Sequence, residues 1–442
     1  MQSSNSSRYE RLATQLQRWM GLYGYERLET PILQPADLFL TRAGDQIVAR
    51  LFTFDHGGKQ FALRPEYTSP AMSHYIREGL TAPVRWQFSG VVFEEAEDST
   101  RQQHFSIGAE AIGWPSGLAD AEIVALAVRG LQNSGLSDVR VHIGHVGFLL
   151  ALVGKHLTDS RLVRFLLNHA ALLREPDGEA RMRAQLDRLI NGEWDRGETS
   201  SESPSPAIMD ALLGALERSQ LMGGRTREDI QRRLQRKLAR AEARPQIEAA
   251  LSLLQELTRL EGDRTVVMPA LRELARGDVE AQSILTEWEQ TLNWCERLGV
   301  TAESIVVTPA LSRNWDYYSG LVFELHGGGQ HTGGGGRYDE LARLLGAAKP
   351  VPAVGFAYYV DDVLAALPAP PAKAASWSLQ ASEVTAALAD WLEALRGRGI
   401  AISLQAEPGK LQVNESGELV AGERRFRLGE ADAAASWLEA QS

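Results

Sequence analysis

The sequence predicts an α+β protein in which an antiparallel sheet, flanked by helices, carries a small-molecule pocket. Stretches that alternate apolar and polar residues, as strands do, occur within residues 24–144 and again within 304–360, and a nearly continuous helical stretch separates them. The second group surrounds glycines 327–329 and 333–336, where we expect a tight turn and a close approach of the backbone to a bound amino acid. We therefore expect residues 311–356 to contain a tight glycine loop and to form one wall of the pocket.

The N-terminal helices and strands follow one another at short intervals. Apolar residues at helical spacing predict a helix over 8–22, and alternation around a His-Gly-Gly turn predicts a hairpin over 50–63. A helix, two strands, a helix and a strand are then predicted at 70–78, 84–95, 104–113, 119–134 and 138–144. Pro31 lies in the strand-like run 24–40 and cannot donate a hydrogen bond, so this strand is expected at a sheet edge or a subunit boundary.

The sequence divides into a large core and a small C-terminal module. Residues 1–367 are expected to form the core, with a helical insertion at about 146–300. The loop at about 191–206 is predicted to be disordered, because its Ser, Pro and acidic residues cannot bury enough apolar area to become ordered. A Pro- and Ala-rich linker at 368–376 leads to a small α/β module at 377–442.

The composition excludes several classes of protein. A net charge of −11 argues against general nucleic-acid binding, since phosphate affinity comes mainly from Lys and Arg. The single cysteine, Cys295, excludes internal disulfides and cysteine-built metal sites. With no signal peptide and no stretch of about 20 apolar residues, we expect a cytoplasmic protein with no membrane contact. The nine histidines show no ligand spacing, so no metal is expected. We also expect no cofactor.

Five short stretches resemble, in order, the catalytic core of the class II histidyl-tRNA synthetases. They are RPEYT at 64–68, FSIGAEAIG at 105–113, RNWDYYSGLVFE at 313–324, GGGGRYD at 333–339 and AVGFA at 353–357. In addition, GYERLETPIL is similar to the dimer-forming first motif of that class, with Pro31 in its proline position. The resemblance implies a class II antiparallel sheet that holds histidine and ATP side by side, and a homodimer through the interface near Pro31.

The resemblance also implies which residues would bind the amino group and the imidazole of histidine. Glu66 and Thr68 match the residues that hold the ammonium of the substrate, and a carboxylate with a hydroxyl suits a cation. Glu110 and Tyr318 match the pair that contacts the imidazole.

Three further positions complete the expected histidine pocket. Arg313 matches the arginine that contacts the substrate carboxylate and the reacting centre, and Tyr338 lines the same cleft. Ser106 stands where the family has glutamine. Serine is shorter and lacks the paired donor and acceptor of an amide, so histidine binding is expected to be retained but weakened.

The ATP half departs from the family at four positions. Glu94 replaces the arginine that holds the α-phosphate, and Ala96 replaces a later glutamate. Tyr359 replaces a glycine, and Asp362 replaces the arginine on the γ-phosphate. The cleft is then expected to be lined by the acidic residues Glu94, Glu95, Asp361 and Asp362. At ~4 Å a like-charge contact costs roughly 1–4 kcal/mol, so we predict that this degenerate ATP site no longer supports adenylation.

A class II core without ATP chemistry resembles the regulatory subunits of ATP phosphoribosyltransferase. Those paralogues assemble with a short catalytic subunit in the first step of histidine biosynthesis and make it sensitive to histidine, and this is our preferred interpretation. An active but divergent histidyl-tRNA synthetase and a stand-alone amino-acid sensor are the alternatives. The predicted module at residues 377–442 departs from the pattern of the regulatory paralogues, which often lack a C-terminal domain.

Overall fold

The computed structural model describes most of the chain, in two compact units at Met1–Leu367 and Pro368–Ser442. The described residues are 2–40, 50–95, 102–157, 159–191, 244–311, 313, 317–368, 377–380, 385–398, 400, 402–405, 410–414, 418–427 and 430–440. The predicted disordered loop beyond residue 191, the predicted linker beyond residue 368 and the predicted site residue Ala96 lie outside these ranges.

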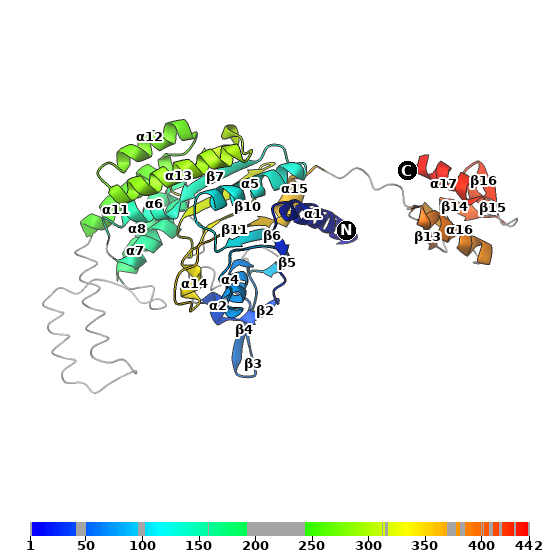
Figure 1. Cartoon of the computed structure of the whole chain (residues 1–442), viewed down its shortest axis with the longest axis horizontal. Coiled ribbons are helices and arrows are strands. Elements are labelled where there is room, and N and C mark those ends of the chain that lie inside the picture. The colour runs from blue at the N-terminus through cyan, green and yellow to red at the C-terminus, as the bar shows by residue number, and fades with distance from the viewer. Residues whose placement is uncertain are drawn as a thin grey trace. The chain divides into compact units, whose positions relative to one another are not determined.

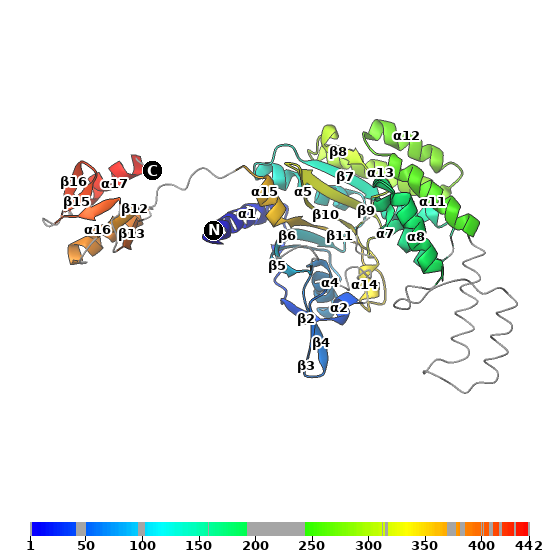
Figure 2. The same cartoon turned by 180° about the vertical axis from the view of Figure 1, so that it is seen from behind.

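An eight-stranded sheet organises the first unit (Figures 1 and 2). In spatial order its strands are β1 (Glu26–Arg27), β5 (Val84–Phe93), β6 (Gln103–Ile112), β11 (Ala353–Tyr359), β10 (Gln330–Arg337), β9 (Leu321–Gly327), β7 (Arg140–His145) and β8 (Ile305–Val307). Only the two outermost pairs, β1 with β5 and β7 with β8, are parallel. The predicted α+β fold with an antiparallel sheet flanked by helices is confirmed.

One face of the central strands packs against helices. These are α1 (Gln2–Gly21), α5 (Leu118–Asn133) and α15 (Val360–Ala366). On β6 the buried residues Ile107 and Ala109 belong to this helix-side core, and on β11 the hydroxyl of Tyr358 donates to the carbonyl of Ala127 in α5 at 2.7 Å. Since side chains alternate along a strand, Ser106, Glu110 and Tyr359 point from the opposite face.

The helical insertion forms a group of helices beside β7 and β8 (Figure 1). It contains α6 (Val146–Val153), α7 (Ser160–Asn168), η1 (Ala170–Arg174), α8 (Gly178–Asn191), α11 (Arg244–Arg259), α12 (Arg264–Leu274), α13 (Val279–Arg297) and η3 (Ala302–Ser304). Asp263 and Asp278 begin α12 and α13 by accepting hydrogen bonds from backbone N–H groups of the first turn, at 2.7 and 3.1 Å. Cys295 is buried in α13, and burial raises the pKa of its thiol to about 12. Among the described residues, no helix combines the length and the apolar composition needed to cross a membrane.

A three-stranded sheet lies below the large one in Figure 1. Its order is β2 (Leu33–Pro35), β4 (Lys59–Leu63) and β3 (Thr53–His56), and α2 (Asp37–Leu40), α4 (Thr68–Arg77) and α14 (Leu341–Leu344) lie nearby. The predicted hairpin is confirmed, and Gly57 and Gly58 form its turn with φ of 58° and 74°. The prediction of one strand in the run 24–40 is wrong: the run is divided between β1 and β2, in different sheets, and Pro31, which lacks an N–H, falls between them. The predicted edge position is confirmed, since β1 and β2 are each an edge strand of their sheet.

The prediction of a glycine loop over 327–336 is also wrong. Gly328 and Gly329 form a turn, but Gly333 to Gly336 lie within β10 and pair on both sides, with β9 and with β11. A loop was predicted because glycine is unfavourable in most strands. This strand is an exception, because side chains from elsewhere cover its glycines.

The second unit is a small α/β module. Its five-stranded sheet has the order β13 (Ile402–Gln405), β12 (Trp377–Gln380), β14 (Leu411–Val413), β15 (Glu418–Ala421) and β16 (Arg424–Arg427). Helices α16 (Ala386–Gly397) and α17 (Ala431–Ala440) complete it, and Trp391 and Leu395 of α16 are buried in a core of its own.

Candidate functional site

A pocket of about 480 Å³ opens on the face of the large sheet that the helices leave free. This volume is typical of small-molecule sites, which span about 300–1,000 Å³. Nine of the predicted site residues line it: Glu66, Thr68, Glu94, Ser106, Arg313, Tyr318, Tyr338, Tyr359 and Asp362. Glu110 lies just beneath, hydrogen-bonded to two of them. The structure therefore brings the residues predicted for both halves into one cavity.

Glu110 is a buried carboxyl at the bottom of the pocket. It is 1% exposed, and it accepts hydrogen bonds from the Thr68 hydroxyl at 2.7 Å and from the Tyr338 hydroxyl. Desolvation raises the pKa of Glu110 to about 8, although both hydroxyl donors act to lower it. This group is therefore largely protonated at pH 7, and a cationic ligand would favour its ionised form.

Glu66 provides a second carboxyl on the same side of the pocket. Its two oxygens accept hydrogen bonds from the backbone N–H of Ser69, at 3.0 and 3.1 Å, which holds the side chain at the N-terminal end of α4. Desolvation raises the pKa of Glu66, and the hydrogen bonds from Ser69 oppose this. The negative charge of Glu66 also contributes to the raised pKa of Glu110. Two carboxyls in one desolvated site favour a ligand with positive charge.

Three glycines lie on the pocket face of the sheet, and two of them, Gly334 and Gly355, line the pocket. Gly334 and Gly336 of β10 and Gly355 of β11 share the face that carries Glu110. A Cβ at Gly355 would overlap the Glu110 carboxylate, a Cβ at Gly334 would overlap the Arg313 guanidinium, and a Cβ at Gly336 would lie 3.0 Å from the Tyr318 ring. Gly334 and Gly336 were predicted to approach a bound amino acid, whereas the side chains that lie against them belong to the chain itself.

Arg313 lies between the two halves of the pocket and is held by its neighbours. Its Nη2 donates to the Tyr359 hydroxyl at 2.9 Å, and its Nη1 donates to the carbonyl of Phe323 at 3.3 Å. The same Nη1 lies 3.7 Å from the carboxylate of Glu324. Tyr359 stands at the position where the family has glycine. It therefore accepts a hydrogen bond from the guanidinium that was predicted to contact a ligand.

The acidic side of the pocket is less negative than the sequence suggested. Glu94 forms an ion pair with Arg50 at 3.1 Å. Asp361 accepts a hydrogen bond from the Tyr9 hydroxyl and lies 3.7 Å from Nδ1 of His104. Glu95 does not contribute to the lining, whereas Arg50 and His104 do. The prediction of a cleft lined by four carboxylates must be corrected, since these partners are distant in the sequence and only the fold brings them together.

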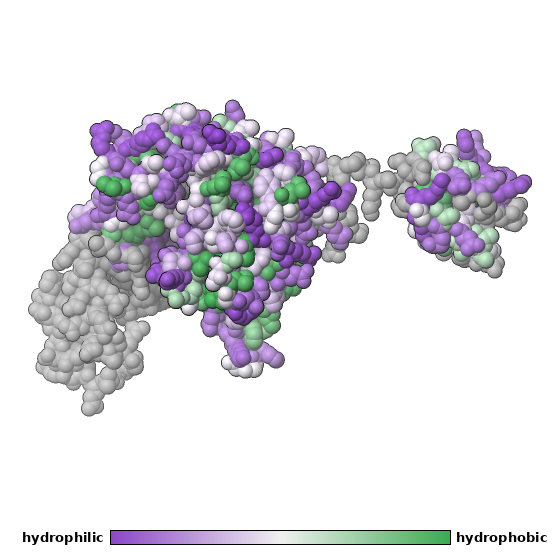
Figure 3. Space-filling model, viewed as in Figure 1, coloured by the Kyte–Doolittle hydropathy of each residue, from purple (hydrophilic) through white to green (hydrophobic). Residues whose placement is uncertain are grey.

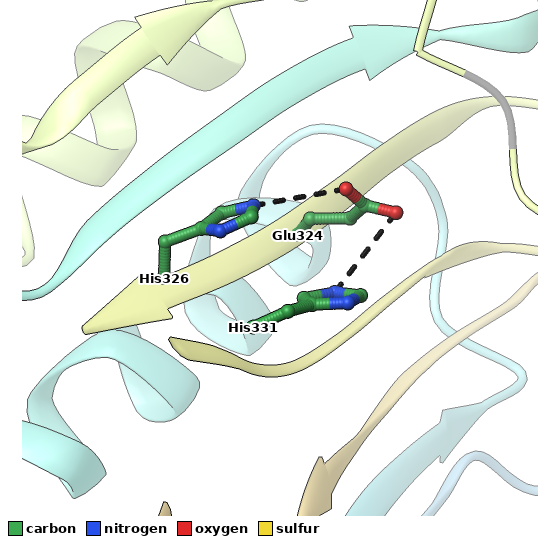
Figure 4. A group of neighbouring side chains, drawn as sticks. All are labelled: Glu324, His326 and His331. Atoms are coloured by element: carbon green, nitrogen blue, oxygen red, sulfur yellow. Dashed lines mark ion pairs between the residues drawn. The ribbon is translucent and has the colours of Figure 1, made fainter. Parts of the chain in front are cut away.

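One cluster at the pocket was missed by the sequence analysis. Glu324 and His326 on β9 and His331 on β10 place a carboxylate and two imidazoles close together, as Figure 4 shows. Desolvation lowers the pKa of His331. Desolvation also acts to raise the pKa of Glu324, but nearby His326 and Arg313 outweigh it and the net pKa is lowered. Spacing along the chain did not indicate these residues as ligands because pairing of β9 with β10 is what brings His331 beside His326.

The fold and the pocket define a protein of the class II aminoacyl-tRNA synthetase type, with an antiparallel sheet whose free face is lined by the predicted ligand residues. A family model described as histidyl-tRNA synthetase matches residues 1–175 and 204–363. The chain belongs to the histidyl-tRNA synthetase family. The matched residues end within α15, before the second unit.

Relatives with two different names are similar to this chain. Histidine–tRNA ligase of Methanocaldococcus jannaschii is 30% identical over 349 residues, which cover 77% of this chain and 68% of that protein. The ATP phosphoribosyltransferase regulatory subunit of Agrobacterium fabrum is 30% identical over 356 residues, which cover 77% of this chain and 92% of that protein. A Bacillus halodurans structure described as an ATP phosphoribosyltransferase regulatory subunit/histidyl-tRNA synthetase shares the fold, with a TM-score of 0.63 at 22% identity over 90% of this chain and 88% of that one.

Proposed function

We propose that this chain is a non-catalytic regulatory subunit of ATP phosphoribosyltransferase. It would act with a short catalytic subunit in the first step of histidine biosynthesis and bind histidine in its own pocket. One observation carries the proposal: the residues expected to bind the ammonium and the imidazole of histidine line or underlie the pocket, while Tyr359 engages Arg313, the cation expected at the reacting centre. The regulatory subunit of Agrobacterium fabrum, of which this chain covers 92%, supports it.

The amino-acid side suits histidine in both charge and shape. Glu66 and the hydroxyl of Thr68 offer acceptors for an ammonium group. Glu110, with its raised pKa, would accept from an imidazole N–H or pair with an imidazolium. Tyr318 and Tyr338 complete the wall around it. Bound histidine would therefore be the feedback signal that the subunit passes to its partner.

The phosphate side opposes the binding of a polyphosphate. Asp362 lines the pocket at the position where the family has an arginine. Glu94 forms an ion pair with Arg50, which neutralises the positive charge of that arginine. Amino-acid activation depends on preorganised positive charge around the transferring phosphorus. With Arg313 already held by Tyr359 and near Glu324, that charge is not available, and adenylation would be lost.

Reconstitution with a short catalytic subunit tests the proposal. The full chain, the short subunit and their mixture would each be assayed for phosphoribosyl transfer to ATP. We expect no transfer with the full chain alone, a rate with the mixture at least about tenfold above the short subunit alone, and inhibition of the mixture by histidine. Equal rates for the short subunit with and without this chain would refute the proposal. Glu110→Gln should reduce inhibition by histidine, while the control Glu256→Gln, at an exposed position on α11, should not.

A divergent histidyl-tRNA synthetase is the second candidate. Two cations in the pocket, Arg50 and Arg313, and the similarity to the Methanocaldococcus jannaschii ligase favour it. Pyrophosphate exchange into ATP that depends on histidine would support it and overturn the regulatory proposal, provided that Arg313→Ala abolishes the exchange. Histidine binding with neither exchange nor an effect on a catalytic subunit would indicate an amino-acid sensor.

We also propose a homodimer through the region of Pro31. Ile32, Leu33 and Phe54 are 43%, 44% and 44% exposed. Figure 3 shows hydrophobic residues at the base of the β3–β4 hairpin, while its tip is hydrophilic. Because β2 is an edge strand of its sheet, its outer side is available for pairing. Leu33→Glu is expected to convert dimers to monomers in analytical ultracentrifugation. The control Leu118→Glu, at a residue that is 53% exposed on α5, should leave the dimer intact.

A further inference from the structure

The cluster of Glu324, His326 and His331 shares one face of the sheet for simple geometric reasons. Glu324 and His326 are two residues apart on β9, so their side chains point to the same side. His331 on β10 lies directly opposite His326 in the register of the two strands. Figure 4 shows the carboxylate beside both imidazoles. The β9–β10 hairpin thus presents two nitrogens and a carboxylate to one point.

We propose that Glu324, His326 and His331 form a binding site for a divalent transition-metal ion, with zinc as the best match. The Glu324 carboxylate lies 3.7 Å from Nε2 of His326 and 3.9 Å from Nε2 of His331, and one ligand atom from each residue lies within 4.8 Å of the others. Zinc bonds of about 2.0–2.2 Å place tetrahedral ligands roughly 3.4 Å apart. Small side-chain rotations therefore suffice to close the site around an ion.

The surroundings favour a metal over a set of ion pairs among the side chains. Distances of 3.7 and 3.9 Å are longer than ordinary hydrogen bonds. Nε2 of His331 is buried and makes no hydrogen bond within the part of the chain that the structure describes. The rings of His326 and His331 are stacked, with centroids 5.0 Å apart and planes at 17°, which aligns the two imidazoles on the same side. An unprotonated imidazole nitrogen without a donor is suited to binding a metal.

A neighbouring histidine would orient the site. The ring of His142 on β7 packs edge-on against His326 with a centroid distance of 4.7 Å. Its Nδ1 lies 3.1 Å from the carboxylate of Glu261 and 3.2 Å from the hydroxyl of Thr308. His142 is therefore fixed by partners of its own, as residues that support a metal ligand commonly are. We assign it a positioning role.

The ion would be reached from the pocket. Glu324 and His331 both line the cavity, and three protein ligands leave a fourth position open on a tetrahedral ion. That position would accept an amine, an imidazole or a carboxylate of a bound amino acid. The ion would also repel Arg313, which lies 3.7 Å from Glu324, and would weaken that contact. This inference does not rest on the proposed partner.

Zinc titration of the full chain tests the site. The protein would be prepared without a histidine tag, treated with a chelator, and titrated with zinc sulfate by calorimetry and against a chromophoric chelator. We expect one equivalent to bind, and His326→Ala and His331→Ala each to weaken that binding by about tenfold or more. His56→Ala, which removes an exposed histidine from β3 in the other sheet, should bind as the wild type does.

Cobalt substitution and folding controls separate the outcomes. Cobalt in a tetrahedral site of nitrogen and oxygen ligands would give visible absorption in the wild type and the His56→Ala protein, and not in His331→Ala. Circular dichroism would establish that each variant is folded. The proposal would be overturned if the wild type bound no zinc, or if folded His326→Ala and His331→Ala bound it with unchanged affinity.

Discussion

Replacement of Glu110 by glutamine should remove a large pH dependence from the stability of the first unit. The folded pKa of this carboxyl is about 8, against an ordinary value of 4.5, because of desolvation. Between these two values the folded protein holds a proton that the unfolded chain releases, so stability falls as the pH rises. At about 1.4 kcal/mol for each pH unit, the full effect is at most roughly 5 kcal/mol, a large fraction of the ~5–15 kcal/mol that stabilises a typical domain.

Glutamine matches the protonated carboxyl in shape and does not ionise. Urea unfolding of the wild type and of Glu110→Gln would be followed by circular dichroism from pH 5 to pH 9. We expect similar stability near pH 5, and an increasing advantage for the variant as the pH rises toward 9. Other titrating groups and the second unit contribute equally to both proteins, so they cancel in the difference between the two unfolding free energies. Parallel profiles over this range would refute the argument that Glu110 is held protonated by burial.

Three further substitutions test a glycine that lines the pocket, a buried ion pair and a side chain of the pocket wall. Gly355→Ala places a methyl group where the Glu110 carboxylate lies, and should cost about 1–3 kcal/mol of stability in urea unfolding and abolish histidine binding in calorimetry. Asp120→Asn removes the negative charge of the buried carboxylate that lies 2.7 Å from Arg337, and should lower the unfolding free energy by about 3 kcal/mol or more. Ser106→Gln restores the amide of the family and should tighten histidine binding by about 0.5–1.5 kcal/mol, up to roughly tenfold, in calorimetry.

Each of these substitutions has a control or a contrary outcome. Gly397→Ala in α16 adds a methyl group to open space and should be neutral or slightly stabilising, unlike Gly355→Ala. Wild-type stability in Asp120→Asn would show that the contact between Arg337 and Asp339, at 2.9 Å, suffices. If Ser106→Gln bound histidine with unchanged or weaker affinity, the prediction that residue 106 lies beside the bound histidine would be contradicted.

Local patterns predicted most of the fold, because alternation and helical spacing report which side of an element is buried. They predicted α5 and the β5–β6 pair to within a residue or two. They did not predict β10, since a strand of glycines has no side chains to alternate. Only the tertiary structure shows that Arg313 and Tyr318 cover those glycines and replace the missing side chains.

The resemblance indicated residues that line the pocket, but not how they are paired. Glu94 was expected to present a free charge, yet Arg50 neutralises it from 44 residues away. The Tyr9 hydroxyl reaches Asp361 across 352 residues. The contact between Tyr9 and Asp361 depends on the packing of α1 and α15 against the sheet. No local sequence pattern predicts that packing.

The glycines that line the pocket have a consequence for attempts to change ligand preference. At Gly334 and Gly355 the pocket is lined by residues that have no side chain to shorten. Substitutions there can only make the cavity shallower, and they displace the residues above. Variants that accept a larger ligand must therefore come from changes in the walls, such as Tyr318 or Tyr359, while changes at these glycines can yield only proteins that select smaller ligands or bind none.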